Sequence, residues 1–151
     1  MKNNYYLLGV ISLVCALLAY SGFEGKKQIE QRKKDYATYV NVMESISKKE
    51  DLDTIIKNIE NLEEDYGKSD KLTLAKIEAY AAWNETKNVQ SEFENLFNEN
   101  KHLTDNSTLL VLYSEALYTN GEKDKAKEAI SKASQIGIPD EYKQRADVIM
   151  N

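Results

Sequence analysis

The sequence is poor in the residues that interrupt helices. It has one proline and six glycines among 151 residues. Because proline removes a backbone donor and glycine costs conformational entropy, a chain with so few of them can sustain long helices. Runs of β-branched residues are also few, which disfavours a sheet, whereas the abundant lysine and glutamate are good helix formers. These features predict an all-α fold.

Cysteine and histidine are nearly absent. Cys15 is the only cysteine, so no intramolecular disulfide can form, and His102 is the only histidine. A single histidine with no suitable cysteine or serine arrangement supplies neither a usual metal site nor a catalytic triad. The numerous carboxylates lie on the polar sides of helical patterns, as a solvated face does. We therefore predict that the protein is not an enzyme and holds no metal or cofactor.

Positive charge is concentrated at the amino-terminal end. Residues 1–34 carry six basic and two acidic side chains, a balance of +4, whereas residues 35–151 carry 14 basic and 23 acidic ones, a balance of −9. Nucleic-acid binding requires clustered lysine and arginine. The acidic body of the chain therefore disfavours a nucleic-acid partner.

Residues 5–23 form a hydrophobic run of 19 residues without a charge. As a helix this run would rise about 28 Å, close to the thickness of the hydrocarbon core of a membrane. It predicts either a single-pass transmembrane helix behind a short tail, residues 1–4, or a secretory signal that is cleaved. Residues 24–34 follow as a basic juxtamembrane stalk, expected to contact anionic lipid through Lys26, Lys27, Arg32, Lys33 and Lys34.

Two opposing signals leave the side of the membrane open. Five basic residues follow the hydrophobic run and one precedes it, so the positive-inside rule places the remainder of the chain in the cytoplasm. The signal-like start argues for the extracytoplasmic side. The localisation predicted from sequence is a membrane-anchored protein of unresolved orientation.

The remaining residues, 35–151, read as helices of about 12–16 residues joined by short turns. Asp51 is placed to cap one helix, Ser69 or Asp70 begins the next, and Gly67 lies between them. Pro139 suits the first turn of a last helix. The helices are predicted in pairs, 33–48 with 51–66, 70–83 with 86–98, and 107–120 with 122–135.

The stretch LYSEALYTNGEKDKAKEAISKASQIGIP, residues 112–139, has small residues at helical spacing. Two helices that pack at close range need small side chains where their axes come nearest. The stretch resembles the tetratricopeptide repeat, a helix–turn–helix of about 34 residues with small residues at that contact. With Gly121 on the turn, the small and large positions of the two helices match Ser114, Leu117, Ala126, Ile130 and Ala133.

The pair upstream matches the repeat less well. A shift of 33 residues places Ile77, Tyr80 and Ala81 on first-helix positions but puts Phe93 where a small residue is expected. A shift of 34 puts Trp83 on the large position instead. The first pair shows helical periodicity without a repeat signature. The resemblance implies that antiparallel helix pairs of the tetratricopeptide type stack as a short superhelix over residues 35–151, behind one transmembrane helix.

Stacked helix pairs build a concave groove, which recognises an extended peptide or a partner helix. The resemblance therefore implies a membrane-anchored adaptor or scaffold that binds a protein partner. By analogy of architecture, such a protein belongs in a secretion or cell-envelope complex. The alternatives are a structural subunit that forms a homo-oligomer through its anchor and stalk, or a secreted helical protein formed by signal cleavage.

Groove positions transfer from the resembling family to eight residues, with the shift of 33 used for the middle repeat. The lysine and asparagine residues that clamp a peptide carboxylate in some family members are absent from these positions, so a basic or mixed apolar partner segment is expected. The predicted partner-binding residues are Glu78, Ala82, Glu85, Thr108, Val111, Glu115, Tyr118 and Thr119.

Overall fold

The structure, a computed structural model, describes residue 30, residues 33–34 and residues 36–151. The predicted tail, the predicted transmembrane helix or signal, and most of the predicted basic stalk lie outside the described residues. Among the residues that are described, no helix is both long and apolar enough to cross a membrane. The chain divides into two compact units at Asn41 and Val42, and the site described below lies within the second.

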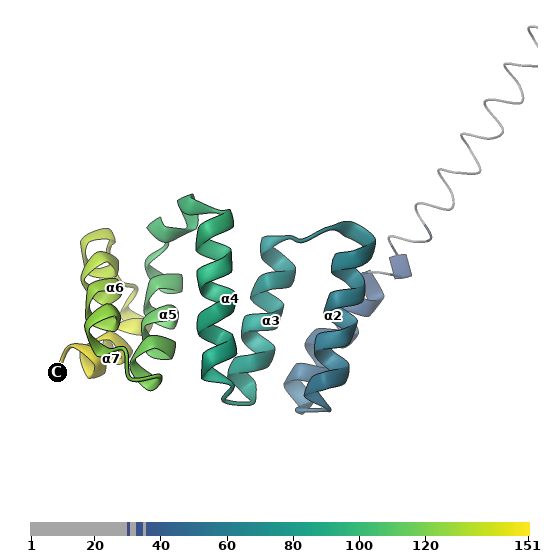
Figure 1. Ribbon diagram of the computed structural model, residues 1–151, viewed down its shortest axis with the longest axis horizontal. Helices are drawn as coiled ribbons and strands as arrows, with labels where there is room; N and C mark the ends of the chain where they lie inside the picture. Colours follow the sequence, from purple (N-terminus) through teal and green to yellow (C-terminus); the bar gives the residue numbers. More distant parts are fainter. Residues whose placement is uncertain (1–29, 31–32, 35) are drawn as a thin grey trace, which may run out of the picture. The chain divides into compact units, whose positions relative to one another are not determined.

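The unit Val42–Asn151 is helical. A helical segment ends at residue 48, and the elements that follow are α2 (Leu52–Tyr66), α3 (Asp70–Ala82), α4 (Thr86–Glu99), the 3-10 helix η1 (Lys101–Asp105), α5 (Ser107–Thr119), α6 (Lys123–Ile136) and α7 (Asp140–Met150). Helices α2 to α6 pack side by side in chain order, and α7 packs against both α5 and α6 (Figure 1). No strand occurs in the described part of the chain, where the predicted all-α class is confirmed.

The helix starts follow local side-chain chemistry. The Asp51 carboxylate accepts a hydrogen bond from the Thr54 amide at 2.9 Å, and the Ser69 hydroxyl accepts one from the Leu72 amide. Both satisfy amides that have no partner within the helix, and both predicted starts are confirmed. Pro139 differs from its prediction: it lies before the first turn of α7, because its extended backbone makes it the cap of that helix.

The same turn joins the helices of each pair. Lys49, Asn84 and Gly121 have φ angles of 52°, 59° and 88°, in the left-handed region. At each turn the amide of this residue donates to the carbonyl three residues earlier, and the next amide donates to the carbonyl five residues before it. Three helix pairs therefore share one turn, including the first pair, for which the sequence offers periodicity alone.

The turns correct the predicted registers. Asn84 stands 35 residues after Lys49, and Gly121 stands 37 residues after Asn84. The shifts of 33 and 34 proposed for the middle pair are therefore wrong. The physical reason is the connection before α5, where η1 adds a turn of helix that the connection between α2 and α3 lacks.

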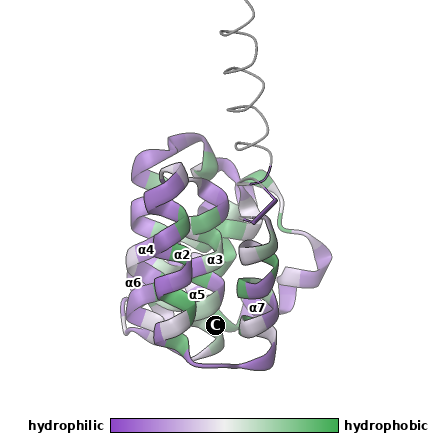
Figure 2. Cartoon of the chain, turned by 90° about the vertical axis from the view of Figure 1, so that its right-hand side faces the viewer, coloured by the Kyte–Doolittle hydropathy of each residue, from purple (hydrophilic) through white to green (hydrophobic). Residues whose placement is uncertain are grey.

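The predicted small-residue contact lies between α5 and α6, the two helices with the most extensive mutual packing. Ser114, Ala126 and Ala133 are each 0% exposed, and Leu117 and Ile130 are 1% exposed. The Ser114 hydroxyl is satisfied, because it donates to the Val111 carbonyl at 2.6 Å. The buried residues of α6, Ala126, Ala129, Ile130 and Ala133, recur at steps of three and four, as in a helix with one buried face. Figure 2 shows hydrophilic and hydrophobic residues together on the helices.

An ion pair whose side chains are largely buried joins α3 to α2. The Lys76 ammonium lies 2.6 Å from the Glu63 carboxylate, and both side chains are 11% exposed. Burial by itself would lower the pKa of Lys76, but the hydrogen bond and charge of Glu63 outweigh it and raise the pKa, with help from Glu92 and Glu60. The ammonium therefore stays charged in the folded chain.

Candidate binding cleft

A cleft opens between α3 and α5. It has a volume of about 570 Å³ and opens to solvent. Helices α3 and α5 make no extensive contact with each other, whereas each packs on α4, so α4 forms the floor between them. We call this the α3–α5 cleft; its lining is Leu74, Ile77, Glu78, Ala81, Asn84, Thr86, Val89, Phe93, Leu112, Glu115, Ala116, Thr119 and Arg145.

The floor of the cleft is apolar and well packed. Ile77 and Val89 are 7% and 6% exposed, and Phe93 is 1% exposed. The Phe93 ring packs on Phe97 and Tyr113, each with a centroid distance of 5.8 Å. Such close packing restricts rotation of the Phe93 side chain, so the floor has a fixed shape.

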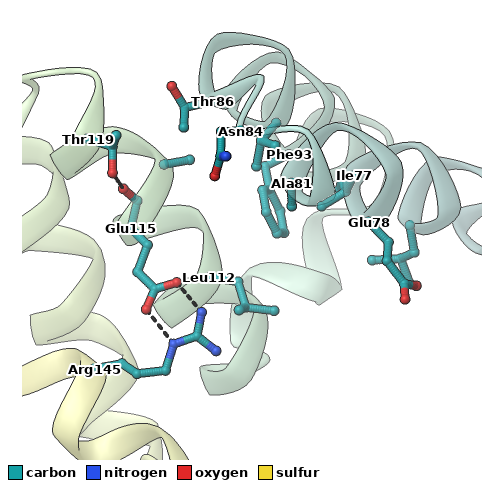
Figure 3. A pocket seen from close by; sticks show the side chains of 13 residues that line it. Ile77, Glu78, Ala81, Asn84, Thr86, Phe93, Leu112, Glu115, Thr119 and Arg145 are labelled. Carbon is teal, nitrogen blue, oxygen red and sulfur yellow. Dashed lines mark hydrogen bonds and ion pairs between the residues drawn. The ribbon is translucent and has the colours of Figure 1, made fainter. Parts of the chain in front are cut away.

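Three charged side chains lie at the edges of the cleft, and two of them form an ion pair. The Arg145 guanidinium of α7 donates two hydrogen bonds to the Glu115 carboxylate of α5. The hydrogen bond to Glu115 raises the pKa of Arg145 above its ordinary value, against the effect of burial. Glu78 lies apart from this pair, and Ala81 and Leu112 lie between them (Figure 3). Within residues 36–151, Glu78 is exposed and has no ion-pair partner.

A polar network holds the end of the cleft. The Thr86 hydroxyl donates to the Asn120 side-chain oxygen at 2.6 Å. The Asn120 amide donates in turn to the Thr86 carbonyl at 3.1 Å and to the Gln90 side-chain oxygen at 2.8 Å. These bonds join the start of α4 to the end of α5. The network thus ties α4 to α5 at this end of the cleft.

Three of the eight residues predicted to bind a partner line this cleft together: Glu78 from α3, and Glu115 and Thr119 from α5. The structure shows where they lie, and their role in binding stays a prediction. The Thr119 hydroxyl donates to the Glu115 carbonyl. Its hydrogen is therefore already used within α5, and only its oxygen can accept a hydrogen bond from a partner.

The other five predicted residues do not line the cleft. Val111 is 0% exposed and packs in the hydrophobic core with Leu110 and Leu117, so its side chain does not reach a groove. Glu85 borders a separate groove beside Tyr80, and Tyr118 borders a small cavity near the end of α7. Thr108 and Ala82 are half-buried and line none of these cavities. For Glu85 the cause is the wrong register of the middle pair, because the shift of 37 between Asn84 and Gly121 sets Glu85 against Glu122 and not against Tyr118.

Leu74, Leu112 and Arg145 line the cleft although they are not among the predicted residues. Leu74 could have been found from the sequence by aligning Asn84 with Gly121, because asparagine adopts the left-handed conformation more readily than most residues. That alignment, a shift of 37, sets Leu74 against Val111 and Glu78 against Glu115. Arg145 belongs to α7, the helix that follows the α5–α6 pair, and its approach to Glu115 depends on how α7 packs.

No protein-family model, no curated protein and no solved structure matches the chain. The tetratricopeptide resemblance therefore rests on the residues quoted for it. In the described part of the chain, no group of three or more histidine, cysteine, aspartate or glutamate side chains is placed to hold a metal ion.

Proposed function

We propose that the protein is a non-enzymatic adaptor that binds a segment of a partner protein in the α3–α5 cleft. The observation that carries the proposal is the cleft itself, which opens to solvent, is apolar on its floor and is bordered by a few polar groups. Its volume of about 570 Å³ is similar to that of small-molecule sites, about 300–1,000 Å³, so it would hold a few side chains of a partner segment. A groove between successive helix pairs is also where helical-repeat proteins bind peptides.

The membrane anchor is the second part of the proposal. It rests on the uncharged run at residues 5–23 and the basic residues that follow it. In this reading the anchor restricts the protein to a membrane, and the helical unit recruits a partner there. The analogy with secretion and cell-envelope complexes is one of layout and supplies no named partner.

Site-specific cross-linking in the cells that produce the protein tests the cleft. A photoreactive p-benzoylphenylalanine replaces Leu74, which is 36% exposed and lines the cleft. The same residue replaces Glu128, an exposed position on α6 that lines none of the cavities found in the described residues. We expect a defined protein cross-link from the Leu74 position and none from the Glu128 position.

A blocking variant makes the result specific. Ala81 is exposed and lines the cleft, so Ala81→Trp fills the cleft without changing the core. The cross-linked partner, once purified, should bind the full-length wild-type chain and bind the A81W variant at least about tenfold more weakly, a loss of about 1.4 kcal/mol. Equal binding to both proteins would show that the partner does not use the cleft.

A further inference from the structure

We infer that the α3–α5 cleft selects a partner segment with a basic side chain, lysine or arginine, next to apolar ones, and that Glu78 is the residue that selects it. This inference rests on the proposed function and specifies the chemistry of its partner. Glu115 is paired with Arg145, whereas Glu78, at the equivalent position one helix pair earlier, has no cation of the described residues as a partner.

Glu78 and Glu115 occupy equivalent positions. Each is the ninth residue of its helix, α3 beginning at Asp70 and α5 at Ser107. The turns at the ends of these helices, at Asn84 and Gly121, are separated by the same 37 residues. The two carboxylates therefore stand at the same height on successive first helices of the stack, and both line the cleft.

The two carboxylates differ in the residue that the following helix of the stack places near them, α7 for Glu115 and α5 for Glu78. Glu115 receives two hydrogen bonds from Arg145, the sixth residue of α7. The sixth residue of α5 is Leu112, which lines the cleft and cannot donate a hydrogen bond from its side chain. The position that supplies a cation to Glu115 is thus apolar in α5, and Leu112 lies between Glu78 and the Glu115–Arg145 pair (Figure 3).

Charge complementarity identifies the missing group. Arg145 neutralises Glu115, so the charged side chains that line the cleft leave a net charge of −1, on Glu78. A guanidinium or ammonium from a partner can pair with Glu78 while neighbouring apolar side chains contact Leu74, Leu112 and the floor. Charge-assisted pairs beside an apolar surface are stronger than pairs in open water, because solvent screens them less. The acidic body of the chain, with its balance of −9 over residues 35–151, attracts such a segment from a distance.

Selection from a random peptide display library tests the inference. The targets are the full-length chain in detergent and three variants: E78Q, the matched exposed-site control E128Q, and A81W. We expect peptides selected on wild type and on E128Q to be enriched in Arg or Lys next to Leu, Ile or Phe, and that enrichment to be lost on E78Q. Individual peptides from the wild-type pool should bind E78Q about two- to fivefold more weakly, the range for an exposed ion pair.

A charge exchange excludes a general loss of folding. On E78R, peptides in which the basic residue is replaced by Glu should bind better than their parents. The R145Q variant, which frees the Glu115 carboxylate, should bind the basic peptides more tightly than wild type. Both variants gain a function, which a misfolded protein would not.

The outcomes separate this inference from the proposed function. Peptides that lose binding on A81W but show no preference for basic residues would overturn the selection by Glu78 and leave the cleft as a binding site. Peptides insensitive to A81W would overturn both. If E78Q instead dissociates an oligomer of the full-length chain, measured by light scattering, the occupant is a second copy and the inference of a separate partner is wrong.

Discussion

Tyr113 shows how one side chain connects the core to the surface charge of the molecule. Its ring packs edge-on against Phe97 at 5.4 Å, and its hydroxyl donates to the Glu94 carboxylate at 3.3 Å. The pKa of Tyr113 is raised to about 12, most strongly by burial and then by the charge of Glu94, its hydrogen bond and the charge of Glu122. The phenol is therefore held in its neutral form.

This environment predicts a loss of stability at alkaline pH. A tyrosine in the unfolded chain ionises near pH 10, whereas folded Tyr113 keeps its proton to about pH 12. In that interval the folded state binds more protons than the unfolded state, so its free energy of unfolding falls as pH rises. Tyr113→Phe removes this contribution and keeps the ring. Urea unfolding of both proteins, at neutral pH and again from about pH 10 to 12, should show a shallower decline for Y113F; parallel declines would contradict the prediction.

Pairs of helices are the units from which this domain is built. In each pair, one residue in the left-handed conformation forms the turn between the two helices. Of the three turns only the last has a glycine at the left-handed position. Lys49 and Asn84 adopt the left-handed conformation at the other two. A left-handed conformation costs a residue with a side chain about 1–2 kcal/mol. The turn at Gly121 therefore joins its helices at the lowest conformational cost, and the α5–α6 pair is also the most extensively packed.

Gly121→Ala should destabilise the domain by about 1 kcal/mol, because alanine resists a positive φ. A Cβ at this position would meet no atom within 4 Å, so the cost is conformational and not steric. Asn84→Gly is the reverse test, because glycine replaces a residue that already has a positive φ. We expect the free energy of unfolding to stay nearly unchanged or to rise slightly. Urea titrations of the wild type and both variants measure these free energies of unfolding. A G121A variant as stable as the wild type would show that the turn tolerates a side chain and would contradict the prediction.

The helices were largely predictable from the sequence, and the cleft only in part. Caps such as Asp51 and Ser69 act within one turn of helix, so spacing alone reveals them. The register of the middle pair required a less direct comparison, because asparagine and not glycine occupies the turn position at Asn84 and η1 lengthens the connection before α5. The pairing of Arg145 with Glu115 spans 30 residues and depends on packing that no local pattern encodes.

At the scale of the whole molecule, the segment proposed to attach the protein to a membrane and the unit proposed to bind a partner occupy different parts of the sequence. Positive charge and the uncharged run lie within residues 1–34, while the negative charge and the α3–α5 cleft belong to residues 35–151. A partner that carries a basic segment would be attracted to the second part. Which compartment supplies that partner depends on the orientation of the first part.

The positive-inside rule predicts that the helical domain lies in the cytoplasm, and cysteine labelling in intact cells tests this. Cys15 is the only cysteine, so C15S gives a background without thiols. In that background S131C places a thiol on an exposed site of α6, and N3C places one in the predicted tail. A membrane-impermeant maleimide should label N3C in intact cells and S131C only after permeabilisation. Labelling of S131C in intact cells would contradict the charge rule, and loss of the N3C residue from the mature protein would identify residues 5–23 as a cleaved signal.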